Sequence, residues 1–125
     1  MDINYITGQI VDAALKVHRV LGPGCLESAY EVCLVHELRK RGLGVVSQVP
    51  LSATYDGVTI DIAYRIDLLV ENQVVVELKT ATKMLAVFEA QVLSYLKLSD
   101  RRVGLLINFR VPYLKDGIKR IANRV

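Results

Sequence analysis

The segment from residue 64 to residue 79 constrains the fold most, because two apolar β-type stretches in it carry charges at matched positions. Its sequence is Tyr-Arg-Ile-Asp-Leu-Leu-Val-Glu-Asn-Gln-Val-Val-Val-Glu-Leu-Lys. Side chains alternate between the two faces of a strand, so Glu77 and Lys79 share one face of the second stretch. Both stretches also carry apolar residues on both faces, which is typical of strands inside a sheet. We therefore expect two neighbouring interior strands.

The length of the connection between these strands decides whether their charged residues meet. A slip of one residue moves every side chain to the other face, so a two-residue loop would mix charged and apolar partners. A three-residue loop over residues 71–73 keeps one face apolar and gathers the polar residues on the other. It sets the carboxylates of Asp67 and Glu77 side by side, with Cβ atoms about 5 Å apart. The predicted pairs are Val70 with Val74, Leu68 with Val76, Asp67 with Glu77, and Ile66 with Leu78.

Two carboxylates at this spacing repel each other unless something neutralises them. A divalent cation such as Mg²⁺ or Mn²⁺ does so, because it prefers hard oxygen ligands. Lys79 then lies where it can orient a water molecule or stabilise charge on a phosphoryl oxygen. The alternative is a structural charge network, in which Lys79 pairs across the strands with Asp67 or Glu77. Apolar flanks favour the functional interpretation, since buried charges need a reason.

The rest of the chain predicts an α/β fold in the order α-α-β-β-β-α-β-α. Pro50 marks the first strand as an edge strand or a bulged one, Asp56-Gly57 predicts a hairpin, and Asp116 lies near the start of the last helix. We expect one domain over residues 1–125, with a mixed sheet of about four strands flanked by helices. The predicted helices cover residues 6–21, 26–41, 82–98 and 116–123, and the predicted strands cover residues 45–55, 58–70, 73–79 and 103–108.

The composition sets few limits on partners. The net charge of +3 permits an anionic partner without requiring one. No apolar run approaches membrane-spanning length, and the first residues lack the pattern of a signal peptide. Cys25 and Cys33 would not reach each other on one straight helix, so we expect reduced thiols. We therefore expect a cytoplasmic protein without a membrane partner.

Asp67 and the triplet Glu77-Leu78-Lys79 resemble the motif of the PD-(D/E)XK nuclease superfamily. That motif has an acidic residue on one strand, followed by Glu or Asp, any residue and Lys on the next, and here Ile66 stands in place of its proline. The stretch Gly24-Cys-Leu-Glu27-Ser-Ala-Tyr30 resembles the motif of a small stand-alone family named for GxxExxY. The likeness spans nearly the whole chain. It implies a restriction-endonuclease-like core and divalent-metal nuclease chemistry.

The resemblance adds three helical residues to the candidate site. Glu27 matches an acidic residue that superfamily members place near the metal, although it also suits an ordinary helix N-terminus. Gln91 and Tyr95 are neighbours on one helix face and match a Gln-x-x-x-Tyr pattern, the alternative being a core tyrosine beside a solvated glutamine. The candidate catalytic residues are Asp67, Glu77, Lys79, Gln91 and Tyr95, and the candidate metal ligands are Glu27, Asp67 and Glu77.

The resulting functional hypothesis is a nuclease that uses Mg²⁺ or Mn²⁺ to hydrolyse phosphodiester bonds of DNA, in preference to RNA. Cutting both strands with so small a chain often requires a homodimer. The alternative is a catalytically silent module that keeps the nuclease fold and binds nucleic acid or a partner protein. The small size favours this alternative somewhat, because a minimal domain has no separate DNA-reading region.

Overall fold

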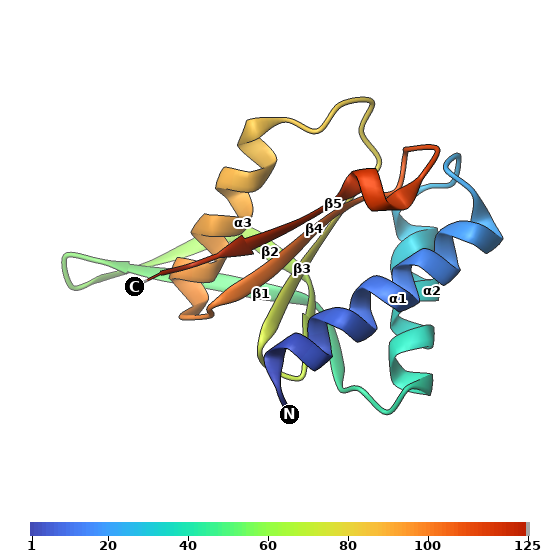
Figure 1. Cartoon of the computed structure of the whole chain (residues 1–125). Coiled ribbons are helices and arrows are strands. Elements are labelled where there is room, and N and C mark those ends of the chain that lie inside the picture. The colour runs from blue at the N-terminus through green and yellow to red at the C-terminus, as the bar shows by residue number, and fades with distance from the viewer. Residues whose placement is uncertain (125) are drawn as a thin grey trace.

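The computed structural model describes residues 1–124, with the backbone alone for residues 62 and 63; Val125, which the expected domain includes, lies outside the described residues. Helices and strands follow one another along the chain as Figure 1 shows. The helices are α1 (Ile3–Leu21), α2 (Glu27–Lys40), α3 (Ala86–Ser99) and the 3₁₀ helix η1 (Leu114–Gly117). The strands are β1 (Val45–Tyr55), β2 (Val58–Val70), β3 (Val74–Lys79), β4 (Val103–Asn108) and β5 (Ile118–Ala122).

The sheet is mixed, as predicted, and has five strands in the order β1-β2-β3-β4-β5. Neighbouring strands are antiparallel except β3 and β4, which run parallel. A parallel pair needs a crossover connection, and α3 supplies it. Every residue of β4 is buried and so is every residue of β3 except Lys79, because helices cover both faces here.

The helices divide between the two faces of the sheet, giving a three-layer α/β/α sandwich (Figure 1). α1 and α2 pack on one face, where the ring of Tyr30 stacks on Phe109 at 4.2 Å between centroids. α3 packs on the other face, close to β4 at Gly104. A Cβ at Gly104 would lie 2.7 Å from Val92 of α3, so only glycine permits this approach. None of the described helices is long and apolar enough to cross a lipid bilayer.

The predicted helix over residues 116–123 is wrong, because most of this segment forms β5. Ile118 pairs with Ile107 and Ile121 pairs with Gly104 of β4. The spacing of the two isoleucines suits a helix, and the local pattern alone favours one. The open edge of β4 outweighs it, since its backbone groups would otherwise stay unpaired at the edge of a largely buried strand. The sheet therefore gains one strand over the expected four.

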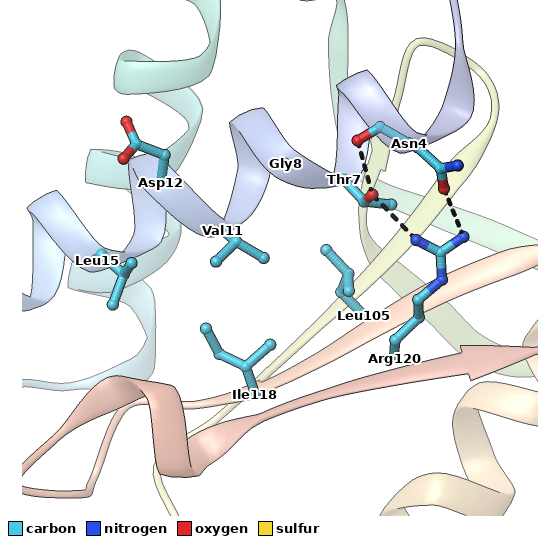
Figure 2. A pocket seen from close by; sticks show the side chains of 9 residues that line it. All are labelled: Asn4, Thr7, Gly8, Val11, Asp12, Leu15, Leu105, Ile118 and Arg120. Atoms are coloured by element: carbon cyan, nitrogen blue, oxygen red, sulfur yellow. Dashed lines mark hydrogen bonds between the residues drawn. The ribbon is translucent and has the colours of Figure 1, made fainter.

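Side chains of α1 hold β5 in place (Figure 2). Ile118 faces Val11 and Leu15 across a groove between the helix and the strand. The guanidinium of Arg120 donates to the Thr7 hydroxyl at 3.2 Å and to the Asn4 side-chain oxygen at 3.0 Å. These contacts come from residues more than a hundred positions away along the chain, so no local sequence window contains them.

The first two strands form the predicted hairpin, whose tip projects beyond the rest of the sheet (Figure 1). Tyr55 pairs with Val58, and both turn residues have positive φ, 50° at Asp56 and 77° at Gly57, as a tight two-residue turn requires. The register shifts next to Pro50, and β1 is an edge strand. Both predictions for Pro50 are therefore confirmed.

α3 begins at Ala86, four residues later than predicted. The apolar spacing that includes Met84 extends the helical pattern towards the strand, but the chain must first cross from the sheet to the helix layer. Ala81 is still held at the end of β4, where its backbone N–H donates to the Asn108 side-chain oxygen at 3.0 Å. Leu85 keeps an extended backbone immediately before the helix.

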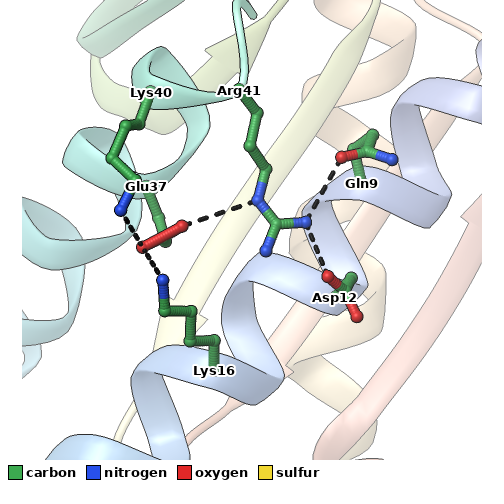
Figure 3. Close-up of polar contacts among 6 residues, drawn as sticks. All are labelled: Gln9, Asp12, Lys16, Glu37, Lys40 and Arg41. Atoms are coloured by element: carbon green, nitrogen blue, oxygen red, sulfur yellow. Dashed lines mark hydrogen bonds and ion pairs between the residues drawn. The ribbon is translucent and has the colours of Figure 1, made fainter.

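A buried carboxylate fastens α1 to α2 (Figure 3). Glu37 of α2 is 8% exposed and contacts Lys16 of α1 at 2.8 Å. Lys40 and Arg41 approach the same carboxylate at 3.6 Å each. Arg41 also reaches back to Asp12 of α1 at 2.7 Å. The charge of Glu37 is therefore well compensated.

Candidate functional site

From Leu68 to Val70, strand β2 pairs with β3 in the predicted register. Their ladder joins Leu68 with Val76 and Val70 with Val74, and residues 71–73 form the three-residue connection. Glu71 and Asn72 in this connection have positive φ, 51° and 55°. The loop-length prediction from side-chain parity is therefore confirmed.

Beyond Leu68 and Val76, the backbone ladder ends, and the carboxylates of Asp67 and Glu77 form the hydrogen bonds between the two strands. The Asp67 N–H donates to Oε1 of Glu77 at 3.0 Å, and the Leu78 N–H donates to Oδ2 of Asp67 at 2.8 Å. Each acidic side chain thus accepts a hydrogen bond from the backbone of the other strand. This reciprocal arrangement brings Asp67 and Glu77 together as predicted, but through hydrogen bonds between side chain and backbone, since the ladder pairs end at Leu68 and Val76.

One predicted pair in this register is wrong. Ile66 packs in the core beneath α3, whereas Leu78 packs in the core beneath α1 and α2. The two side chains therefore lie on opposite sides of the sheet. The alternation of faces fails here because the two carboxylates occupy the positions where ladder hydrogen bonds would have continued.

The electrostatics of the pair are dominated by the burial of Glu77, which is 4% exposed. Burial, followed by the charge of Asp67, raises the pKa of the Glu77 carboxyl to about 8. The backbone hydrogen bond from Asp67 and the charge of Lys79 oppose this shift. The protein therefore holds a carboxyl that would take up a proton at neutral pH unless a cation neutralises the pair.

Lys79 ends β3 next to the carboxylates, with its ammonium turned to α3. Its Nζ donates to Oε1 of Gln91 at 3.4 Å and lies 4.8 Å from the centre of the Phe88 ring. The sequence-predicted residues Lys79 and Gln91 are thus in contact. A lysine held by a neutral amide and a ring keeps its charge available to the carboxylates or to a bound anion.

Tyr95 lies one helical turn after Gln91 and is 8% exposed. Burial, and then the charges of Glu77 and Asp67, raise the pKa of its hydroxyl to about 12. Tyr95 therefore stays protonated and can donate a hydrogen bond. Its ring centroid lies 6.0 Å from that of Tyr64 on β2, a residue that the sequence did not single out.

Glu27 begins α2 and is exposed, on the helix side of the site. Partial desolvation and the charge of Asp67 raise the pKa of Glu27, and Lys79 opposes the shift. Glu27 is therefore close enough to Asp67 and Lys79 for their charges to change its pKa. Tyr30, three positions later, has a structural role instead: its hydroxyl donates to the Gly22 carbonyl and accepts from the Cys25 N–H.

A family model described as the PD-(D/E)XK nuclease superfamily matches residues 4–121, from α1 into β5. The chain belongs to the PD-(D/E)XK nuclease superfamily. No curated protein and no solved structure matches it. The predicted α/β core is therefore confirmed.

Members of this superfamily typically use a divalent metal, and the donor set here suits one. Asp67 and Glu77 supply hard carboxylate oxygens whose mutual repulsion a cation relieves. Within the described part of the chain, no three His, Cys, Asp or Glu side chains lie close enough together to hold an ion. Mg²⁺ does not need three, because it usually keeps several waters and binds one or two carboxylates. The pair therefore fits Mg²⁺ better than a metal with an all-protein ligand shell.

Asn108 is a buried polar residue next to Lys79 that the sequence prediction missed. It is 2% exposed and pairs with Lys79 across the parallel strands. Its side chain also brackets Ala81, accepting from the backbone N–H at 3.0 Å and donating to the carbonyl at 2.9 Å. These bonds fix the chain directly after Lys79. The sequence pattern that could have indicated Asn108 is a polar residue at the end of an apolar strand, because a buried polar side chain requires hydrogen-bond partners.

Proposed function

We propose that this superfamily member is a nuclease that uses Mg²⁺, or Mn²⁺, to hydrolyse phosphodiester bonds of DNA. The observation that carries the proposal is the reciprocal bonding of Asp67 and Glu77 at the point where β2 and β3 stop pairing, with Lys79 beside them. A structural ion pair would compensate Glu77, yet its pKa is raised to about 8. That imbalance supports a site that accepts an additional cation.

In this proposal Asp67 and Glu77 hold the metal through their carboxylate oxygens. A bound metal would supply Lewis-acid chemistry, stabilising charge on the phosphoryl group and activating water for attack. Lys79 orients the attacking water and stabilises negative charge on a phosphoryl oxygen. The buried surroundings of Glu77 strengthen these interactions by excluding water.

Three further residues support the same chemistry. Gln91 steadies the ammonium of Lys79 through the 3.4 Å contact. Tyr95 keeps its proton and donates to the phosphate or to the carboxylates. Glu27, exposed at the start of α2 and coupled electrostatically to Asp67, would be the third acidic residue to help hold the metal.

The stretch from Gly24 to Tyr30 supports placing the chain in the GxxExxY group of the superfamily. Its tyrosine closes the loop between α1 and α2, and its glutamate lies on the side of Asp67. A homodimer of this chain would present two such sites to the two strands of DNA. The net charge of +3 is compatible with a polyanionic substrate.

The test is incubation of DNA with the purified protein and Mg²⁺ or Mn²⁺, comparing the wild type with Lys79→Ala. The matched control is Lys97→Ala, a lysine in the last turn of α3. Cleavage should be lost in Lys79→Ala and kept in Lys97→Ala. Cleavage that persists in Lys79→Ala would come from a contaminant and would refute the proposal.

A silent binding module remains the second candidate, favoured by the fact that no three-ligand cluster occurs among the described residues. Calorimetric titration with Mn²⁺ separates the two. The nuclease requires binding that Asp67→Asn weakens strongly. Equal heats for the wild type and Asp67→Asn, together with DNA binding but no cleavage, would support the module.

A further inference from the structure

A small cavity lies between α3 and Tyr64 of β2, beside the candidate site. Its volume is about 200 Å³, below the roughly 300–1,000 Å³ typical of cavities for drug-sized ligands. Val87 and Leu98 give it apolar walls, and Gln91 and Ser94 add polar groups. These dimensions and this lining suit one planar ring system with hydrogen-bonding edges.

The aromatic residues of the cavity differ sharply in exposure. Tyr95 is 8% exposed and belongs to the core beneath α3, whereas Tyr64 is 55% exposed. Their ring centroids lie 6.0 Å apart with the planes tilted by 44°. An exposed tyrosine beside a cavity offers a π-face on which another ring can stack.

A single side chain separates the cavity from the lysine of the candidate site. Gln91 lines the cavity, and its Oε1 accepts from Nζ of Lys79 at 3.4 Å. The amide nitrogen of Gln91 and the hydroxyl of Ser94 can serve the donor and acceptor groups of a heterocycle. A ring in this cavity would therefore belong to a molecule whose neighbouring groups reach Lys79.

The cavity lining carries no charged side chain among the described residues, which disfavours a phosphate and favours a base. We propose, on the basis of the nuclease function proposed above, that the cavity holds one unpaired nucleobase next to the phosphodiester that is cleaved. Tyr64 stacks on this base, while Gln91 and Ser94 bond its edge.

This assignment names a substrate class. Bases in a duplex are stacked on both sides, and one enters a pocket only after unstacking and unpairing. A single strand presents its bases without that cost, and aromatic stacking tolerates any of them. The preferred substrate is therefore single-stranded nucleic acid, or a duplex with an unpaired nucleotide.

The experiment measures binding of a short, fluorescently labelled oligodeoxythymidine strand and of a duplex of equal length, with Ca²⁺ in place of Mg²⁺ to suppress cleavage. The wild type should bind the single strand more tightly. Tyr64→Ala should weaken that binding roughly 5- to 150-fold, the range for one base–aromatic stack. Tyr64→Phe should keep most of the affinity, and duplex binding should change little in either variant.

The matched control is Tyr55→Ala. Tyr55 is 73% exposed near the tip of the β1–β2 hairpin and is not among the cavity-lining residues. Its substitution should leave single-strand affinity within about twofold of the wild type. Equal affinity for both DNAs, no measurable binding of either, or equal losses in Tyr64→Ala and Tyr55→Ala would each overturn the base pocket. Circular dichroism of each variant confirms that it is folded.

The outcome is separable from that of the nuclease proposal. Single-strand binding that depends on Tyr64, without cleavage under any metal, would leave the base pocket standing and refute the nuclease. Cleavage of duplex alone, with rates unaffected by Tyr64→Ala, would refute the pocket and keep the nuclease.

Discussion

Two buried glutamates, Glu37 and Glu77, sit in opposite electrostatic surroundings. Glu37 is 8% exposed and meets three cations between α1 and α2 (Figure 3). Its hydrogen bond with Lys16 lowers the pKa of the Glu37 carboxyl. Glu77 is 4% exposed and lies against a second carboxylate, and burial raises its pKa to about 8.

The charge of Glu37 stabilises the fold, whereas the fold only tolerates the charge of Glu77. Glu37 joins two helices, and its partners come from the helices themselves. Glu77 accepts one hydrogen bond from the Asp67 backbone N–H and feels the charge of one lysine, Lys79. These two interactions do not balance the charge of two carboxylates. A buried carboxylate without enough positive charge around it is typical of a functional site, because stability alone would favour its replacement by an apolar residue.

The largest expected difference between the two glutamates is in cleavage. Glu77→Gln should lower the Mg²⁺-dependent cleavage rate by about 100-fold or more, since it removes a metal ligand in the proposed mechanism. Glu37→Gln should leave the rate per folded molecule unchanged. Initial rates on single-stranded DNA at saturating Mg²⁺ test this, with the folded fraction measured in parallel. A strong loss in Glu37→Gln alone would reverse the assignment.

The second prediction concerns pH. Folded Glu77 binds a proton more tightly than unfolded Glu77, whose pKa is near its ordinary value of 4.5. Its contribution to the free energy of unfolding is therefore complete below that value and is lost as pH rises to about 8. Metal-free wild type should lose stability relative to Glu77→Gln across this window.

Urea unfolding at several pH values measures the difference. Saturating Mg²⁺ should abolish or reverse it, because the metal binds the ionised carboxylate and releases the proton. A difference that does not vary with pH would show that Glu77 is already ionised in the folded protein without metal.

The third prediction concerns Glu37, whose pKa shift has the opposite sign. Its carboxylate stabilises the fold above its unfolded pKa, and this stability is lost as pH falls through the lowered folded value. Glu37→Gln should reduce Tm by several degrees at neutral pH and by less in acid. Differential scanning calorimetry tests this. An unchanged Tm at neutral pH would mean that the three cations offset no more than the cost of burial.

The smallest effect is expected at Gln91, which contacts Lys79 through one long hydrogen bond. Gln91→Ala should lower the cleavage rate by only about 2- to 10-fold, the equivalent of one weak hydrogen bond. Gln91→Glu should instead shift the rise of activity with pH to higher pH, because a third carboxylate beside Lys79 raises the pKa of Glu77 further. Rate profiles over pH distinguish this electrostatic effect from a loss of folding.

Much of the sheet followed from local pattern. Parity predicted the three-residue loop between Val70 and Val74, and the motif placed Glu77 and Lys79 on one strand. The Asp56-Gly57 turn followed from the need for positive φ. These features depend on backbone sterics and on the two-residue period of a strand, which a short window contains.

Other features depended on contacts between distant parts of the chain. The isoleucines Ile118 and Ile121 suit a helix by spacing, but the edge of β4 draws them into a strand. Ile66 leaves the apolar face predicted for it because the carboxylates interrupt the ladder next to it. Tyr64 lies next to Tyr95 only because α3 crosses over the sheet.

The sequence by itself determined the order of most elements, the register of β2 and β3 next to their connecting loop, and which two carboxylates and which lysine come together. These are consequences of periodicity and residue chemistry along neighbouring positions. Only the tertiary structure decided how exposed each charge is and which cations reach it. The hydrogen bond with Lys16 sets the pKa of Glu37 below its ordinary range, and burial sets that of Glu77 above it; neither cause is a property of a residue alone.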